Sequence, residues 1–217
     1  SNIVEFMQYS DADALSKALT DGSLDMAAPV SASTATGLNG KDGLTVKEGA
    51  TTDKVLLAYN NGIDSLLSDE QARKAFRYQI DAAGIASAQP DAAGALGGPI
   101  SPLEPGYEDL TGLYPHDENQ AGQMFSYFGA QYLTTVNLVA PEEYRSLAET
   151  IKQQIERQPR PTVNLEVLSD EDYAKRIKDG KWELTVMSMD GTDDAGIFAD
   201  PDSMFHYDHT EAQQLSL

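Results

Sequence analysis

The stretch that decides the fold is residues 133–189, LTTVNLVAPEEYRSLAETIKQQIERQPRPTVNLEVLSDEDYAKRIKDGKWELTVMSM. Its apolar residues switch between the alternating spacing that is typical of a strand and the spacing of about 3.6 that is typical of a helix. Pro141 suits a first helical turn, while Pro159 and Pro161 stop the helix that follows it. The predicted order is strand, helix, strand, helix, strand, over residues 133–139, 141–158, 162–167, 169–180 and 182–189.

Connections of this kind between strands are right-handed and leave neighbouring strands parallel. The three predicted strands therefore end on one edge of the sheet, where the loops after Val139, Leu168 and Met189 gather. Open α/β sheets bind their ligands at that edge. The last of these loops, residues 190–201 (DGTDDAGIFADP), is the most acidic and glycine-marked stretch of the chain. It is the leading candidate site by geometry.

The remainder of the chain continues the alternation of strands and helices, so the predicted class is α/β. Ser10 is the predicted cap of a helix that Gly22 ends, and Ser68 with Gln71 forms a capping box for a second helix. Residues 29–43 are rich in Ser, Thr, Ala and Gly, which favours a linker. Further strands are predicted over residues 3–7, 24–28 and 55–59.

The composition argues against several kinds of function. With 15 Lys and Arg against 35 Asp and Glu, the formal net charge is −20, and such a surface repels nucleic-acid phosphates and anionic lipid headgroups. The absence of cysteine excludes disulfides, thiolate metal sites and cysteine nucleophiles. No apolar run approaches the ~20 residues of a membrane span. Ser1 and Asn2, placed before an abrupt Ile3-Val4, resemble a tag remnant joined to a cut inside a longer chain, so we expect a fragment.

The acidic loop also suggests calcium, because Asp190, Thr192 and Asp194 take positions 1, 3 and 5 of an EF-hand-like loop. The rest of that pattern fails. Ala195 stands where the turn needs Gly, and Pro201 stands where a bidentate Glu is needed. A solvated connection, with Asp and Gly suited to turns, is the simpler interpretation.

A second possibility for metal binding comes from His206 and His209, whose spacing of three places both on one helical face. A polar surface helix explains them equally well. The motifs of serine hydrolases and of nucleotide-binding P-loops are absent from the sequence. A metal-dependent hydrolase that uses these histidines and the acidic residues 190–202 is therefore the alternative function, while no resident metal or cofactor is predicted.

Four further segments, in order along the chain, carry a family resemblance. They are ALTDGSLDMA at 18–27, LAYN at 57–60, DEQARKAFRYQID at 69–81, and a loop that runs from GGP at 97–99 to YPHD at 114–117. This order resembles the extracytoplasmic solute-binding proteins of ABC importers, specifically family 5, the peptide and nickel type. The strand and helix alternation over residues 133–189 falls where the second lobe of that family has its own.

The resemblance implies a periplasmic-binding-protein-like type II lobe, in which a mostly parallel open sheet carries helices on both faces. Complete members are considerably longer and have two lobes that close on the solute. By this comparison residues 1–54 are the tail of the first lobe with a crossover segment, residues 55–200 are the second lobe, and residues 201–217 are a truncated return segment. A leader and a lipid anchor would lie upstream, which implies an extracytoplasmic protein in the periplasm or at the cell surface.

The implied function is capture of an oligopeptide or dipeptide, without enzymatic chemistry, for the permease subunits of an ABC importer. In the family's peptide binders a Trp-x-x-Asp-Tyr…Asp-Pro segment follows the strand that matches residues 182–189, and its first Asp pairs with the peptide's α-ammonium. Asp200 matches the Asp-Pro end of that segment, but the Trp and Tyr are absent. The implied ligand-binding set is Asp190, Asp193 and Asp194 as alternatives for the ammonium role, with Asp200. The missing residues also permit a degenerate lobe that acts as a protein-interaction module.

Overall fold

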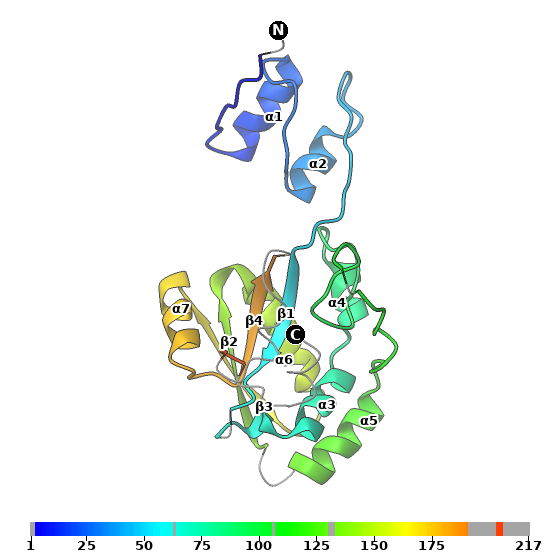
Figure 1. Cartoon of the computed structure of the whole chain (residues 1–217), viewed down its shortest axis with the longest axis vertical. Coiled ribbons are helices and arrows are strands. Elements are labelled where there is room, and N and C mark those ends of the chain that lie inside the picture. The colour runs from blue at the N-terminus through cyan, green and yellow to red at the C-terminus, as the bar shows by residue number, and fades with distance from the viewer. Residues whose placement is uncertain (1–2, 63, 106, 130–132, 191–202, 206–217) are drawn as a thin grey trace. The chain divides into compact units, whose positions relative to one another are not determined.

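The structure is a computed structural model that describes residues 3–62, 64–105, 107–129, 133–190 and 203–205 (Figure 1). The chain divides into two compact units. The first comprises Ser1–Ala50 with Ala86–Gly94, and the second comprises Thr51–Ile85 with Ala95–Leu217. Among the described residues, none of the helices combines the length and the apolar character that a membrane crossing requires.

The first unit contains two helices, α1 (Ala12–Asp21) and α2 (Ala32–Leu38). Gly22 ends α1 in the left-handed conformation, at φ 77°, as predicted. The segment 86–94 belongs to this unit, and Asp91 accepts a hydrogen bond from the backbone N–H of Ala32 at 3.0 Å. Two stretches that are distant in sequence therefore meet at the start of α2.

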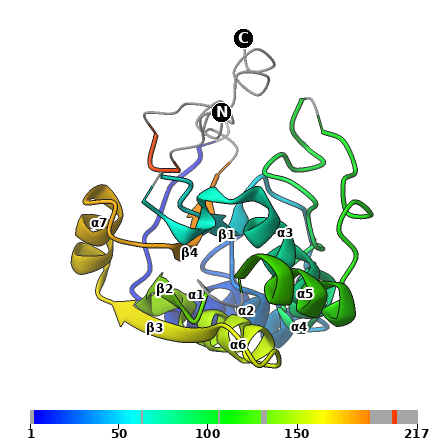
Figure 2. The ribbon, with the colours of Figure 1, turned by 90° about the horizontal axis from the view of Figure 1, so that it is seen from below.

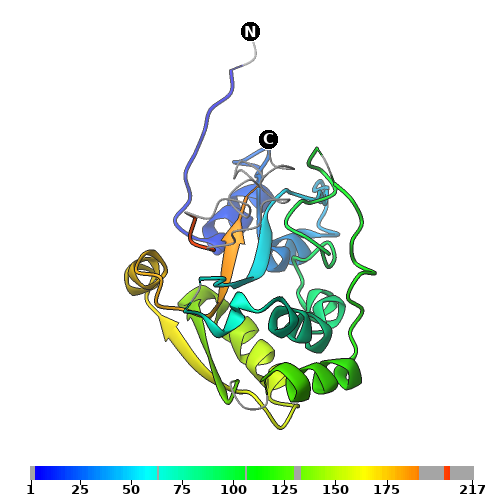
Figure 3. The same ribbon diagram turned by 60° about the horizontal axis from the view of Figure 1, so that its bottom comes forward.

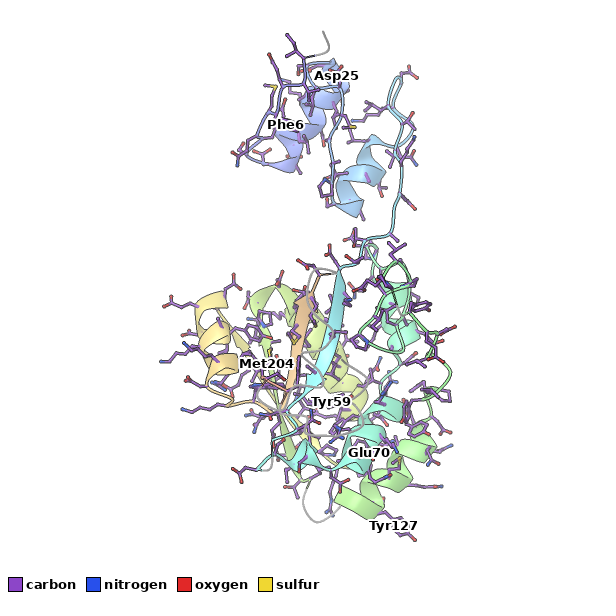
Figure 4. All side chains as sticks on the ribbon, viewed as in Figure 1. Phe6, Asp25, Tyr59, Glu70, Tyr127 and Met204 are labelled. Atoms are coloured by element: carbon purple, nitrogen blue, oxygen red, sulfur yellow. The ribbon has the colours of Figure 1, made fainter. Side chains whose placement is uncertain are left out.

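Two predicted strands of the first unit are wrong. Residues 3–7 and 24–28 form no strand, and the helix α2 lies inside the predicted linker over residues 29–43. A strand needs a hydrogen-bonded neighbour, and in the part of the chain that the structure describes neither segment has one. Residues 3–7 are exposed despite their apolar composition, and Phe6 is 97% exposed (Figure 4).

The second unit is built on a sheet of four strands, β1 (Lys54–Tyr59), β2 (Thr135–Pro141), β3 (Thr162–Leu168) and β4 (Leu184–Met189). Their order across the sheet is β1-β4-β2-β3. β2 pairs in parallel with both β3 and β4, so the predicted parallel arrangement of these three strands is confirmed. β1 pairs with β4 in the antiparallel sense and forms one edge of the sheet.

Helices cover both faces of this sheet (Figures 1 and 2), which confirms the predicted fold class. On one face lie α3 (Glu70–Gln79), α5 (Glu118–Met124) and α6 (Arg145–Ile155). On the other face lies α7 (Asp170–Lys178), which Figure 3 shows apart from the other three helices. The shorter elements are α4 (Ala82–Ala88), the 3-10 turns Leu66–Ser68 and Glu142–Tyr144, and a π turn, Phe125–Gly129.

The central strand β2 is buried on both sides. Leu138 packs in the core beneath α3, α5 and α6, while the next residue, Val139, packs with Trp182 and Phe205 on the side of α7. Successive residues of a strand point to opposite faces, so a strand covered on both faces needs a continuous apolar run. Trp182 is 4% exposed and belongs to this second packed cluster.

Two helices begin one residue later than predicted. Asp11 caps α1 in place of Ser10, and Asp69 caps α3 in place of Ser68. The Asp69 carboxylate accepts a hydrogen bond from the backbone N–H of Gln71 at 2.7 Å. A carboxylate at this position satisfies a free N–H group and also interacts favourably with the positive end of the helix dipole.

The three helices on one face of the sheet are joined by a buried polar network. Gln79, at the end of α3, is fully buried and donates a hydrogen bond to the carbonyl of Gln154 in α6 at 2.6 Å. Gln158 donates to the Gln79 side-chain oxygen and to the carbonyl of Glu118, both at 2.8 Å. The side chain of Gln79 therefore has a partner for its donor and one for its acceptor, which allows a polar group to lie in the core.

The start of β1 is held by a buried ion pair. Lys54 Nζ lies 2.6 Å from Glu104 Oε2, and the two side chains are 3% and 15% exposed. Glu104 also accepts a hydrogen bond from the backbone N–H of Ser101 at 2.7 Å. The hydrogen bond from Lys54, followed by those from Ser101, lowers the pKa of Glu104 from 4.5 to about 2. This pair fixes the loop that contains Glu104 to the edge strand.

We expect Gln79→Leu to lower the free energy of unfolding by about 1–3 kcal/mol, because Gln154 and Gln158 would lose a buried partner. Gln153→Ala is the control, since Gln153 is an exposed glutamine of α6 next to Gln154, and we expect it to change stability by less than about 0.5 kcal/mol. Urea unfolding measures both values. Equal stability of the two variants would contradict the role given to Gln79.

The lowered pKa of Glu104 makes a contribution to stability that depends on pH. It is present in full above the unfolded-state pKa of 4.5 and is lost as the pH falls toward the folded-state pKa of about 2. We therefore expect Glu104→Gln to lower the urea midpoint at pH 7, and the difference from the wild type to shrink as the pH approaches 2. Asp53→Asn, which changes an exposed acid beside β1, is the control. A difference that stays constant with pH would refute this account.

Candidate ligand-binding site

The candidate site lies where the carboxyl ends of β2, β3 and β4 meet. A cavity of about 330 Å³ is lined there by Pro141, which ends β2, by Asp170, which begins α7 after β3, and by Ser188, the second-to-last residue of β4. The predicted gathering of the three strand ends at one edge is therefore confirmed. Below, this space is called the carboxyl-edge cavity.

The topology places this cavity at a switch point of the sheet. The chain passes from β2 to its neighbour β3 through α6, and then returns through α7 across β2 to β4. Right-handed connections that run in opposite directions lie on opposite faces of a sheet, so α6 and α7 leave the edge on different sides. Open α/β sheets bind ligands in the crevice that such a divergence creates.

The interior of the carboxyl-edge cavity is mainly apolar. It is lined by Tyr144, Tyr173, Ile177, Met187 and Met204, while Glu143, Asp170 and Ser188 supply its polar groups. Figure 4 shows Met204 between α7 and β4. Apolar walls with a few polar groups are typical of sites that bind small molecules or peptide side chains.

Tyr173 fixes the position of α7 against the sheet. Its hydroxyl lies 2.8 Å from Thr185 Oγ1 and 3.1 Å from the carbonyl of Val186. Thr185 is fully buried and donates its own hydrogen bond to the carbonyl of Val139 at 2.8 Å, while Tyr173 donates its single hydroxyl hydrogen to the carbonyl of Val186. Burial raises the pKa of Tyr173, which keeps the hydroxyl protonated as a donor.

α7 begins at the start of the helix that the sequence predicts over residues 169–180, with Ser169 as its cap. Ser169 Oγ accepts a hydrogen bond from the backbone N–H of Asp172 at 3.3 Å and lies 3.1 Å from the Asp172 carboxylate. This cap satisfies one of the free N–H groups at the helix start. Asp170 is the first residue of α7, and its place at the cavity is thus set by the end of β3 and by the cap.

A larger cavity of about 650 Å³ lies at the other end of the parallel strands, and several of its polar side chains already have partners within the protein. Arg176 donates two hydrogen bonds to Glu166, at 2.9 and 2.8 Å, which lowers the pKa of Glu166. Glu183 accepts a hydrogen bond from the backbone N–H of Asn137 at 2.6 Å. These contacts engage Glu166, Arg176 and Glu183, and open α/β sheets bind ligands at the carboxyl ends of their strands, so we place the candidate site at the carboxyl edge.

One of the four predicted ligand-binding aspartates lies in the described part of the chain. Asp190 is exposed and directly follows β4. Asp193, Asp194 and Asp200 lie outside the described residues, as do His206 and His209 of the metal alternative. Among the residues that are described, no group of three or more His, Asp or Glu side chains is placed to hold a metal ion.

Glu143 and Asp170 line the carboxyl-edge cavity although neither was in the predicted set. Each follows closely after a predicted strand, so the rule that placed residues 190–201 at the edge points equally to them. Residues 190–201 were chosen only because that loop contains more acidic residues than the other two. Met204 gives no comparable signal, because its place at the cavity depends on how a distant segment folds back over the sheet.

Comparison with solved structures shows the same fold in solute-binding proteins. The oligopeptide-binding protein AppA from Bacillus subtilis, solved with a nonapeptide, is 17% identical with a TM-score of 0.70, and the match covers 95% of this chain and 46% of that one. CtaP, an ABC transporter substrate binding protein from Listeria monocytogenes, is 15% identical with a TM-score of 0.78, covering 96% and 45%. DppA from Helicobacter pylori, solved with the peptide STSA, is 17% identical with a TM-score of 0.66, covering 91% and 38%.

The chain therefore spans less than half the length of these proteins. A search of curated proteins finds no match. The model of one protein family, bacterial extracellular solute-binding proteins, family 5 Middle, matches residues 2–213, which is nearly the whole chain. The chain therefore belongs to family 5 of the bacterial extracellular solute-binding proteins.

Proposed function

We propose that the chain is part of the solute-binding component of an ABC importer, which captures an oligopeptide or dipeptide between two lobes without covalent chemistry. The observation that carries the proposal is the carboxyl-edge cavity, which lies at the switch point of the sheet and is open to a ligand. Family membership supports a solute as the ligand. Two similar structures were solved with peptides, a nonapeptide and the peptide STSA, which favours a peptide here.

The proposed mechanism is closure of two lobes about a hinge. A ligand that contacts both lobes binds the closed form more tightly than the open form, and so shifts the population toward closure. The permease subunits of the importer would then recognise the closed form. The parent protein acts outside the cytoplasm in this proposal, held at the membrane by a lipid anchor in a part of the protein beyond this chain.

Residues 1–54 are proposed as the tail of the first lobe, residues 55–200 as the second lobe and residues 201–217 as a return segment. The first unit supports this division, because its apolar side chains lack a cover among the described residues. Ile3 is 80% exposed, Phe6 97% and Met26 78%. Exposed apolar groups in such number are typical of a surface that another part of the protein buries. The chain spans less than half the length of similar proteins, so the rest of the parent chain is the proposed cover.

Recognition of the peptide's α-ammonium is proposed for one of Asp190, Asp193 and Asp194, with Asp200 also in the site. All four come after β4 in the sequence, and β4 ends at the carboxyl edge of the sheet. A charge-assisted hydrogen bond from a carboxylate to an ammonium contributes about 1.5–3 kcal/mol, which is enough to orient a peptide. Backbone groups would supply contacts that tolerate different peptide sequences.

We expect Phe6→Asp to lower the free energy of unfolding of the full-length protein by about 3–5 kcal/mol, because it would remove a buried aromatic side chain and bury a charge. Glu5→Ala, in the same exposed segment, is the control and is expected to change stability by less than about 0.5 kcal/mol. Chemical unfolding of the full-length protein measures both. An unchanged stability in Phe6→Asp would argue against a cover over this segment.

We expect Asp→Asn at one of positions 190, 193 and 194 of the full-length protein to weaken the binding of pentaalanine at least tenfold. We expect the unmodified protein to bind N-acetylated pentaalanine, which lacks the ammonium, with a similar loss of affinity. That result would identify the ammonium as the group that the aspartate binds. Asp179→Asn is the control, because Asp179 caps the C-terminus of α7, the end away from the carboxyl-edge cavity. Calorimetry that detects binding but no loss in any of the three variants would refute the ammonium role alone, whereas no binding of any peptide would refute the proposed function.

A further inference from the structure

The carboxyl-edge cavity has an unusual distribution of polarity, in which an apolar interior meets two carboxylates. Tyr144, Tyr173 and Met187 are half-buried in its walls, while Glu143 and Asp170 are exposed. The carboxylates thus form the solvent-facing rim of the cavity, and aromatic and thioether groups form its inside. A ligand group that fits this arrangement needs an apolar stem and a polar end of positive charge.

Neither rim carboxylate has a salt bridge or a side-chain hydrogen bond with another described residue, in contrast to many acids of this chain. Arg145, which follows Glu143 closely in sequence, is held by Glu142 through two hydrogen bonds at 2.8 and 2.7 Å. No Lys, Arg or His side chain within the described residues lines the cavity. The protein therefore leaves the negative charge of Glu143 and Asp170 without a cation of its own among these residues.

The N-termini of the two helices beside the cavity offset only part of the negative charge of these carboxylates. Asp170 is the first residue of α7, and Glu143 lies in the 3-10 turn that leads into α6. A helix start carries an effective charge of about +0.5, and an acid in the first turn interacts favourably with it. Two full negative charges exceed two such half-charges, so the rim remains net negative. Stabilising the helices thus accounts for part of the role of these acids and leaves charge available for a ligand.

Lysine and arginine side chains match the cavity in shape and in charge. Their methylene stems pack along apolar surface while their cationic ends stay near water, as an acidic rim requires. Cations also interact favourably with aromatic rings, and Tyr144 and Tyr173 are aromatic residues of the wall. We infer, on the basis of the proposed function, that this cavity receives a lysine or arginine side chain of the bound peptide, with Glu143 and Asp170 as its specificity-determining residues.

The test measures the affinity of the full-length protein for alanine pentapeptides that carry one lysine, norleucine or glutamate at each position in turn. Norleucine keeps an apolar stem similar to that of lysine but lacks the ammonium. At one position we expect the lysine peptide to bind at least tenfold more tightly than the norleucine peptide, with the glutamate peptide the weakest. The preference is expected to fall as salt is raised, because the rim is exposed and its charges are screened.

The double variant Glu143→Gln/Asp170→Asn is expected to reduce the ratio of the two affinities to below twofold. The control Glu171→Gln/Asp179→Asn removes the same number of acids from outside the cavity and is expected to keep the ratio. Glu143→Lys should shift the preference toward the glutamate peptide, a gain that misfolding would not produce. Equal affinity for lysine and norleucine, or a preference that survives the double variant, would overturn this inference while leaving the proposed function intact. If none of the peptides binds, both fail.

Discussion

The parallel pairing of β2 with both of its neighbours is the constraint on which the second unit depends. Parallel strands cannot be joined by a tight turn, so each connection has to cross the sheet as a helix. Because the chain moves from β2 to β3 in one direction and returns to β4 in the other, right-handed crossings place α6 and α7 on opposite faces. The same geometry brings three strand ends together and opens a cavity between the diverging helices.

Apolar packing on the two faces is supplemented by buried polar contacts that fix the helices in position. On one face, Gln79 joins α3 to α6 through hydrogen bonds that leave no partner unsatisfied. On the other face, Tyr173 reaches Thr185 and the carbonyl of Val186 in β4. Hydrophobic burial is not directional, whereas these contacts require defined distances and angles, so they select one arrangement of each helix. Because Tyr173 lines the carboxyl-edge cavity, the same hydrogen bonds also fix the position of part of the cavity wall.

At the carboxyl edge of the sheet, individual acidic residues have a role that the net charge of the chain does not explain. A net charge of −20 keeps anions at a distance, but long-range charge alone does not create a site. At the carboxyl edge, Glu143 and Asp170 lie beside helix starts that favour negative charge, and they also face a cavity. The same residues can therefore stabilise the fold and remain available to a cationic group. Acids that are paired, such as Glu166 with Arg176, contribute to structure instead.

The sequence by itself determined the α/β class, the three parallel strands, the helices between them and the end of α1 at Gly22, because these features follow from residue spacing and from local backbone preferences. Tertiary structure decided what depends on partners distant in the chain. Residues 3–7 and 24–28 have strand-like composition but no neighbour to pair with among the described residues, and β1 joins β4 in a sense that no local pattern encodes. The carboxyl-edge cavity likewise arises only when three strand ends and Met204 pack together, because its walls come from several segments that are distant in the chain.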